Sequence, residues 1–212
     1  MKDISILLQG GLLLMNSEKY KINNTFLPPG SQCVIGLDRD GTINRDLGTY
    51  VTRPEDFEPI PGSLEAVAEL RRRGHSIVII TNQGGIGKGI MTEQDVANVH
   101  NHMLDLLGQA GCPSIDGIYF SESSNKSDMY AKPNIEMFKL AEKENKFKFK
   151  QGFYVGDKMS DLKAAMKIGA RPILVRTGYG LKTEKDLNKY TYKKIKRATY
   201  VFDTLQDFVH EL

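Results

Sequence analysis

Two aspartates, Asp38 and Asp40, follow the apolar segment 33–37, and Gly41 comes directly after them. The apolar segment favours a buried strand, whose alternating side chains would place Asp38 and Asp40 on one side and Arg39 on the other. Neighbouring carboxylates repel each other unless a cation lies between them, and Mg²⁺ prefers such oxygen ligands. A helix N-cap followed by a turn explains one aspartate more simply than two. The pair therefore favours a metal site.

Polar residues also follow a second apolar segment, 76–80. Thr81 and Asn82 stand where a hydroxyl group and nearby backbone N–H groups could hold an anion. The glycine-rich run 84–89 is not a P-loop, which would need glycine in place of Asn82 and serine or threonine at the end of the run. A flexible loop with a solvated Lys88 therefore remains an alternative interpretation.

Charged residues stand at two further positions of this kind. Lys132 lies at the start of a predicted helix, where a single lysine would ordinarily be a surface residue. Asp157 follows the apolar segment 153–155, in the same situation as Asp38. Asp161 comes four residues later and would favour a helix N-terminus.

The segments that must position these residues alternate between strand-like and helix-like patterns. Short apolar segments predict strands at 33–37, 76–80, 117–120, 153–155, 172–175 and, more weakly, 200–202. Amphipathic helices are predicted from a cap at Ser63 to Gly74, from a cap at Thr92 to about Ala110, and over about 134–146, 160–168 and 203–211. This alternation predicts an α/β fold, a Rossmann-like parallel sheet with helices on both faces and ligands at the carboxyl ends of its strands.

Composition and charge narrow the class of protein. The chain has 212 residues and a formal net charge of +3, which allows anionic substrates without requiring nucleic acid. The one basic run, 189–197, is interpreted as a solvated surface. Cys33 and Cys112 have no companions at metal-ligand spacing, so they predict core thiols of a cytoplasmic protein. No segment approaches the length that a membrane span requires.

The N-terminal residues differ from the rest of the chain. We expect residues 1–30 to form a poorly ordered extension and residues 31–212 to form a single domain. The apolar segment 4–14 resembles a signal peptide only weakly, because Asp3 offsets Lys2 and no small-residue cleavage site follows.

Four motifs occur in a fixed order: DxDGT at 38–42, Thr-Asn at the end of a strand, Lys-Pro at 132–133 and GDxxxD at 156–161. This set resembles the haloacid dehalogenase superfamily of phosphotransferases, over about Val34 to Phe208. Within it, the chain is most similar to the branch of D-glycero-D-manno-heptose 1,7-bisphosphate phosphatases and histidinol-phosphatases. Asn44, "TNQ", "GDKMSD" and "VRTGYG" carry that likeness.

The resemblance implies a phosphatase that works through an aspartyl-phosphate. Asp38 would be the nucleophile, and Asp40 would be the general acid and base. Thr81 would bind a phosphoryl oxygen, and Lys132 would neutralise negative charge. Mg²⁺ would bind a carboxylate oxygen of Asp38, the backbone carbonyl of Asp40 and the carboxylate of Asp157. Arg39 would be structural.

Two departures from the resembled branch bear on the substrate. Many members carry a zinc loop of three cysteines and a histidine, whereas residues 121–133 contain neither, so no zinc is expected. An arginine that helps to bind a distal phosphate often precedes the motif lysine, but here that residue is Ala131. A second phosphate would need another cation, and the candidates are Lys88, Arg53 and Lys126. The predicted substrate-binding set is Asn82, Gln83, Lys88 and Arg53.

The spacing of the motifs leaves no room for a cap domain. The site should therefore be open and bordered by the loops 44–56, 83–91 and 121–131, which would select a small phosphorylated substrate. The resemblance implies a sugar bisphosphate such as D-glycero-D-manno-heptose 1,7-bisphosphate, hydrolysed at its C7 phosphate. Histidinol-phosphate phosphatase, nucleic-acid 3′-phosphatase and non-catalytic phosphate binding are the alternatives. We expect no membrane or nucleic-acid partner, and a monomer or weak homo-oligomer.

Overall fold

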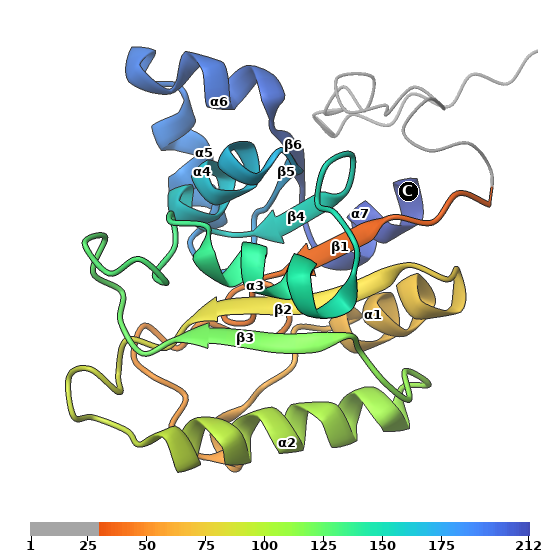
Figure 1. Ribbon diagram of the computed structural model, residues 1–212, viewed down its shortest axis with the longest axis vertical. Coiled ribbons are helices and arrows are strands. Elements are labelled where there is room, and N and C mark those ends of the chain that lie inside the picture. Colours follow the sequence, from red (N-terminus) through yellow and green to blue (C-terminus); the bar gives the residue numbers. More distant parts are fainter. Residues whose placement is uncertain (1–29) are drawn as a thin grey trace, which may run out of the picture.

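A six-stranded parallel sheet forms the centre of the molecule in the computed structural model, which describes residues 30–212 (Figure 1). The strands are β1 (Val34–Leu37), β2 (Ser76–Asn82), β3 (Gly117–Ser121), β4 (Phe153–Gly156), β5 (Arg171–Val175) and β6 (Tyr200–Phe202). Their order is β3-β2-β1-β4-β5-β6, so β1 and β4 are neighbours at the point where the chain reverses its direction across the sheet. Such a switch point is where open α/β sheets bind ligands. The predicted parallel sheet is confirmed, and the expected N-terminal extension lies almost entirely outside the described residues.

Helices cover both faces of the sheet. One face carries α1 (Ser63–Arg72), α2 (Glu93–Gln109) and α7 (Leu205–Glu211), and the other carries α3 (Glu136–Asn145), α4 (Met159–Ile168) and α5 (Gly180–Leu187). The short helix α6 (Lys193–Ala198) packs against α4 and α5. Short 3₁₀ turns occupy Pro54–Asp56 and Tyr190–Tyr192. None of the helices in the described part of the chain is long and apolar enough to cross a membrane.

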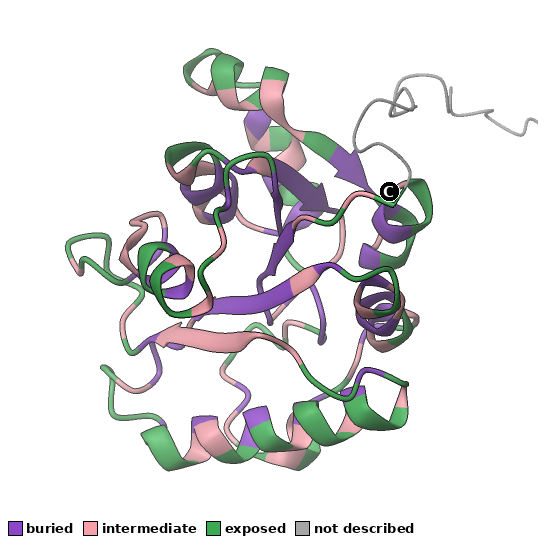
Figure 2. Cartoon of the chain, turned by 45° about the vertical axis from the view of Figure 1, so that its right-hand side comes forward, coloured by how far each residue is buried: buried purple, intermediate pink, exposed green. Residues whose placement is uncertain are grey.

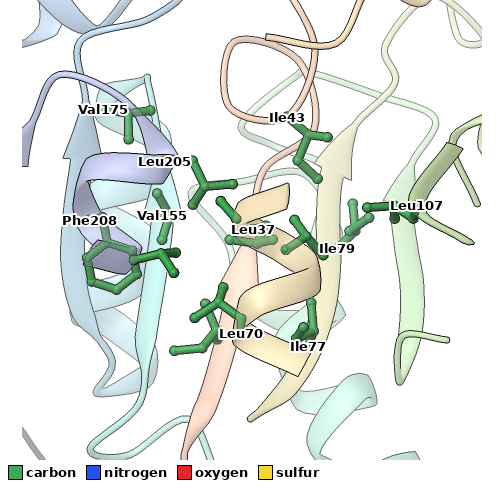
Figure 3. Close-up of a cluster of buried hydrophobic side chains, with 14 of the residues drawn as sticks. Leu37, Ile43, Leu70, Ile77, Ile79, Leu107, Val155, Val175, Leu205 and Phe208 are labelled. Atoms are coloured by element: carbon green, nitrogen blue, oxygen red, sulfur yellow. The ribbon is translucent and has the colours of Figure 1, made fainter. Parts of the chain in front are cut away.

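Alternation along the strands divides the core between these two faces. Leu37, Ile79 and Val155, from three adjacent strands, pack with Leu70 of α1 and Phe208 of α7 (Figure 3). The intervening residues on the same strands face α3 and α4 instead. Figure 2 shows most of the sheet as buried, whereas β3 at the edge is only partly covered. The sheet therefore gives a rigid base whose strand ends cannot move independently.

The helix boundaries match the predicted ones in part. Thr92 caps α2 as predicted, and its hydroxyl accepts a hydrogen bond from the backbone N–H of Asp95. The predicted cap at Ser63 is wrong, because Gly62 is the N-cap of α1 with a φ of 79°, while the Ser63 hydroxyl donates to the carbonyl of Ile43 at 2.6 Å. The helices α5 and α6 were not predicted, since their charged sequences contain few apolar residues to mark a buried face.

Gly36 in β1 leaves room for a neighbouring aromatic ring. A Cβ at this position would lie 2.6 Å from the Tyr154 ring and 2.9 Å from the Phe149 ring. We expect Gly36→Ala to lower the free energy of unfolding by about 1–3 kcal/mol, because the packed core cannot absorb another methyl group. Urea unfolding with an unchanged slope would measure this loss.

Gly108 in α2 provides the matched control for that substitution. No atom lies within 4 Å of where its Cβ would be. Gly108→Ala should therefore be neutral or stabilising by up to about 1 kcal/mol, since alanine favours helix more than glycine does. Equal losses in both variants would mean that crowding around Gly36 is not the cause.

Candidate active site

The carboxyl ends of β1 and β4 bring two of the predicted aspartates together. Asp38 directly follows β1, and Asp157 directly follows β4. The backbone N–H of Asp38 donates to the carbonyl of Val155 at 2.9 Å, which holds the two strand ends side by side. The carboxylates of Asp38, Asp157 and Asp161 each offer an oxygen atom within 4.8 Å of the others.

Lys132 lies at the centre of this cluster. Its ammonium group is 2.9 Å from Asp38 Oδ1 and 2.8 Å from Asp161 Oδ1. It also donates to the backbone carbonyl of Ile80 at 3.0 Å and to the Tyr154 hydroxyl at 2.8 Å. The side chain is almost completely buried, and although burial opposes its charge, the carboxylates of Asp161 and Asp38 hold the pKa of Lys132 above its usual value. Lys132 is therefore a charged, fully engaged group and not a surface lysine.

Asp161 is a site residue whose importance the sequence did not reveal. It lies in the first turn of α4, where its Oδ2 accepts the backbone N–H of Lys158 at 2.9 Å, as expected of a residue that favours a helix N-terminus. Its other oxygen contacts Lys132. The four-residue spacing from Asp157 was the available signal. It places Asp161 in the first turn of the helix that follows the strand, so its side chain can lie near the end of that strand.

The carboxylate cluster has the donor atoms that a hard divalent cation requires. Asp157 is fully buried; its Oδ2 accepts the backbone N–H of Tyr179 at 2.7 Å, and its Oδ1 has no hydrogen-bond partner among the described residues. A Cβ at Gly41 or Gly178 would collide with this carboxylate, so both glycines make room for it. Burial, together with the charges of Asp161 and Asp38 and despite Lys158, raises the pKa of Asp157 well above its usual value. A bound cation would remove that cost, and these residues fit Mg²⁺.

Asp40 has different surroundings from Asp38. Its carboxylate accepts hydrogen bonds from the Arg39 guanidinium at 3.0–3.2 Å, from Asn44 at 2.9 Å and from Gln83 at 3.0 Å. Burial opposes its ionisation, but Arg39 and these amide groups hold the pKa of Asp40 below its usual value. The expectation that Arg39 points away from the acids is wrong. Strand β1 ends at Leu37 and the chain turns, so two-residue alternation no longer applies.

The remaining predicted residues at the end of β2 form hydrogen bonds with other residues of the site. Thr81 is buried, and its hydroxyl accepts a hydrogen bond from Gln83 at 3.0 Å. Gln83 is also buried, so it supports Asp40 and Thr81 and is not among the residues that line the cleft described below. Asn82 exchanges two hydrogen bonds with the backbone of Lys132, at 2.9 and 3.2 Å. It thereby holds Lys132 in place.

An open cleft of about 510 Å³ lies over this cluster. It is lined by residues of three loops and two helix starts, among them Tyr50, Asn82, Ser124, Tyr179 and the lysines Lys88, Lys126, Lys132 and Lys158. Arg53 is not among these residues, because its guanidinium lies in an exposed ion-pair group with Asp56 and Glu55. The basic run 189–197 contributes no residue to the cleft either.

Comparison with known proteins places this geometry in a family. The HAD-hydrolase-like family model matches residues 129–208. Over 176 residues, the chain is 36% identical to the D-glycero-beta-D-manno-heptose-1,7-bisphosphate 7-phosphatase of Neisseria meningitidis serogroup A, covering 82% of this chain and 91% of that protein. The chain belongs to the heptose-bisphosphate phosphatase family of HAD-like hydrolases.

Other members of the heptose-bisphosphate phosphatase family give the same result. The protein of Photorhabdus laumondii with the same name is 39% identical over 160 residues, which are 71% of this chain and 84% of that protein. The crystal structure of the D,D-heptose 1,7-bisphosphate phosphatase from B. bronchiseptica, complexed with magnesium and phosphate, has a TM-score of 0.76 at 28% identity and covers 85% of this chain and 97% of that one. The HAD-like fold is thus confirmed, and residues 30–212 form no separate cap domain.

Binding of Mg²⁺ can be tested without measuring turnover. A ligand that binds the folded state at 100 times its Kd adds about 2.7 kcal/mol, or roughly 5–10 °C in Tm for a domain of this size. We expect Mg²⁺ to raise the Tm of the wild-type protein by several degrees, and Asp157→Asn to remove most of that rise. Asp116→Asn is the control, because Asp116 lies at the amino end of β3, whereas the site lies at the carboxyl ends of the strands. An equal rise in all three proteins would exclude Asp157 as a ligand.

His100 in α2 makes stability depend on pH. Burial and the charge of Arg39, against a smaller effect of Asp40, lower the pKa of His100 to about 3 from an ordinary value of 6.5. Below pH 6.5 the unfolded chain takes up a proton that the folded chain does not, so the free energy of unfolding falls as the pH falls. Between pH 7 and pH 5 this amounts to about 2 kcal/mol. Urea unfolding at both pH values should show a loss that is smaller by about this amount in His100→Asn, and parallel losses would contradict the assignment.

Proposed function

We propose that the protein is a Mg²⁺-dependent phosphatase that removes the C7 phosphate of D-glycero-D-manno-heptose 1,7-bisphosphate. The observation that carries this proposal is the buried Asp38 carboxylate, held at 2.9 Å by Lys132 and grouped with Asp157 and Asp161. The proposed substrate is the one for which the protein's relatives are named, D-glycero-beta-D-manno-heptose 1,7-bisphosphate. An open cleft, over which the described residues form no cap domain, suits a small phosphorylated sugar.

Asp38 is positioned to attack phosphorus. Its Oδ1 accepts the backbone N–H of Arg39 at 2.8 Å in addition to the Lys132 contact, so the carboxylate has one fixed orientation. Attack forms an aspartyl-phosphate and releases the sugar hydroxyl, and hydrolysis of that acyl phosphate then releases inorganic phosphate and restores Asp38. Lys132 and the Thr81 hydroxyl would bind the phosphoryl oxygens. Mg²⁺, held by Asp38, Asp157 and the backbone carbonyl of Asp40 with Asp161 nearby, would neutralise the charge between the nucleophile and the phosphate.

Asp40 is the general acid and general base in this proposal. Because Arg39 favours its ionised form, Asp40 is ready to take a proton from the water that hydrolyses the aspartyl-phosphate. As an acid, it must first gain a proton to give to the leaving alkoxide, and the negative charge of a bound phosphate would favour that protonated form. Gln83 and Asn44 keep the carboxylate in place through both steps.

The cellular setting follows from the same assignment. A phosphatase of sugar phosphate metabolism would work in the cytoplasm, where the free thiols of Cys33 and Cys112 stay reduced. We propose that it does so as a monomer or weak homo-oligomer.

Phosphate release tests the proposal directly. The purified protein with Mg²⁺ would be assayed on heptose 1,7-bisphosphate, fructose 1,6-bisphosphate, histidinol phosphate and a 3′-phosphorylated oligonucleotide. We expect the heptose to be preferred, and Asp38→Asn to lose at least about a thousandfold in kcat because the covalent step is removed. Far-ultraviolet circular dichroism should show that this variant remains folded.

Each outcome of that assay has a distinct meaning. Substantial activity in Asp38→Asn would remove Asp38 as the nucleophile. Preference for histidinol phosphate or the oligonucleotide would keep the phosphatase and replace the substrate. No release from any substrate by the wild-type protein would overturn the proposed activity.

A further inference from the structure

The wall of the cleft carries four lysines and a single aspartate. The lysines are Lys88, Lys126, Lys132 and Lys158, and the aspartate is Asp46. Some of these lysines are balanced by carboxylates at or below the wall, and others are not. The state of each lysine decides which of them can bind a further anionic group.

Two of the four lysines already have carboxylate partners. Lys132 lies between Asp38 and Asp161, as described above. The ammonium of Lys158 is 2.8 Å from Asp46 and 4.0 Å from Asp157. Both are therefore tied to the catalytic end of the cleft.

Lys88 and Lys126 are in a different state. Neither has a carboxylate within 4.0 Å among the described residues, and both are exposed. The ammonium of Lys88 lies 5.5 Å from the centre of the Tyr50 ring, a cation–π contact that leaves its charge unneutralised. Two unpaired ammonium groups thus line the same cleft as the catalytic lysine.

The loops that carry these lysines are joined to each other. The backbone N–H of Gln83 donates to Ser121 at 2.7 Å, and that of Gly87 donates to Glu122 at 2.9 Å. A Cβ at Gly84 would lie 2.6 Å from the Ser124 hydroxyl, so these segments touch. Lys88 and Lys126 are therefore held on one wall and can act on one ligand.

Asn134 sets the shape of the loop around Lys126. Its side-chain amide donates to the backbone carbonyls of Lys126 at 2.9 Å and Asp128 at 2.8 Å. The neighbouring Ala131 is fully buried and does not line the cleft. The loop thus reaches a defined conformation through hydrogen bonds, with Lys126 at the cleft.

We propose that Lys126 and Lys88 form a second anion site, which binds the phosphate of a bisphosphate substrate that is not hydrolysed. Asn134 is a positioning residue for this site. The inference rests on the proposed function for the identity of the ligand, while the site itself rests on the two unpaired lysines. It makes these two residues determinants of the preference for bisphosphates over monophosphates.

Binding decides the inference independently of turnover. Calorimetry in the Asp38→Asn background with Mg²⁺ would compare heptose 1,7-bisphosphate with heptose 7-phosphate, which lacks the second phosphate. We expect the bisphosphate to bind at least about tenfold more tightly, since a phosphate bound to ammonium groups forms charge-assisted hydrogen bonds. Adding Lys126→Met or Lys88→Met should each remove most of that ratio, and Lys126→Arg should restore much of it.

Two further variants separate binding from general structural effects. Lys194→Met removes an exposed lysine of α6 outside the cleft and should leave the ratio of affinities unchanged. Asn134→Ala should lower the ratio of kcat/KM for the two substrates through KM of the bisphosphate while kcat stays within about twofold. A general loss of fold would instead lower activity on both substrates together.

The outcomes are separable from those of the proposed function. A ratio near one in the parent protein, or a ratio unaffected by both lysine substitutions, overturns the second anion site even if phosphate release is normal. A ratio that depends on the lysines supports the site even if another bisphosphate is the better substrate. Absence of phosphate release with a lysine-dependent ratio would reject the activity and keep the site.

Discussion

The buried ammonium of Lys132 is the contact on which the arrangement of the site depends. It joins Asp38 after β1, the Ile80 carbonyl on β2, Tyr154 on β4 and Asp161 on α4. A buried charge without partners would cost several kcal/mol, so all of these groups must be in place together. The contact therefore links the ends of three adjacent strands to one helix. Because the packed sheet beneath is rigid, the nucleophile is oriented before any substrate arrives.

The packing around Lys132 shows how the core serves the chemistry. Tyr154 accepts a hydrogen bond from Lys132 and packs its ring against Phe138 and over Gly36. Asn82 binds both backbone groups of Lys132, so the loop before α3 is fixed from β2. The glycine in β1 and the asparagine at the end of β2 both support this arrangement. Their effect is to hold one side chain at one position.

Much of this architecture could be predicted from the sequence. Each strand is a short apolar segment, and a parallel sheet brings the carboxyl ends of its strands together, so the meeting of Asp38 and Asp157 follows from chain order. Lys132 lies in the loop between β3 and α3, and only the resemblance to the phosphatase family assigned it to the site. The cap at Thr92 could also be predicted, because a capping box is a local interaction. These features depend on spacing along the chain, which the sequence contains.

Other features depend on where a long side chain ends after the chain has turned. Arg39 binds Asp40 because β1 stops one residue before the motif, and that end point is not visible in the alternation of residue types. Gln83 follows the end of β2, and its side chain reaches Asp40 and not the cleft. Arg53 was predicted as a cation for a second phosphate, but its guanidinium pairs with Asp56 and does not line the cleft. Long flexible side chains choose among partners that only the folded structure brings within reach.

Charge balance gives a physical reason why the two ends of the cleft are built differently. Asp38 and Asp161 contact the ammonium of Lys132, and Asp157 lies 4.0 Å from that of Lys158, which Asp46 already pairs, so the cluster keeps an excess of negative charge that a divalent cation would balance. Asp40 is balanced separately by Arg39, which allows it to exchange a proton without disturbing that cluster. Every charge at the catalytic end is thus committed, and none is left to recognise the rest of a substrate. Substrate selectivity must therefore come from the loops. Their exposed lysines can be substituted without changing the catalytic residues at the strand ends.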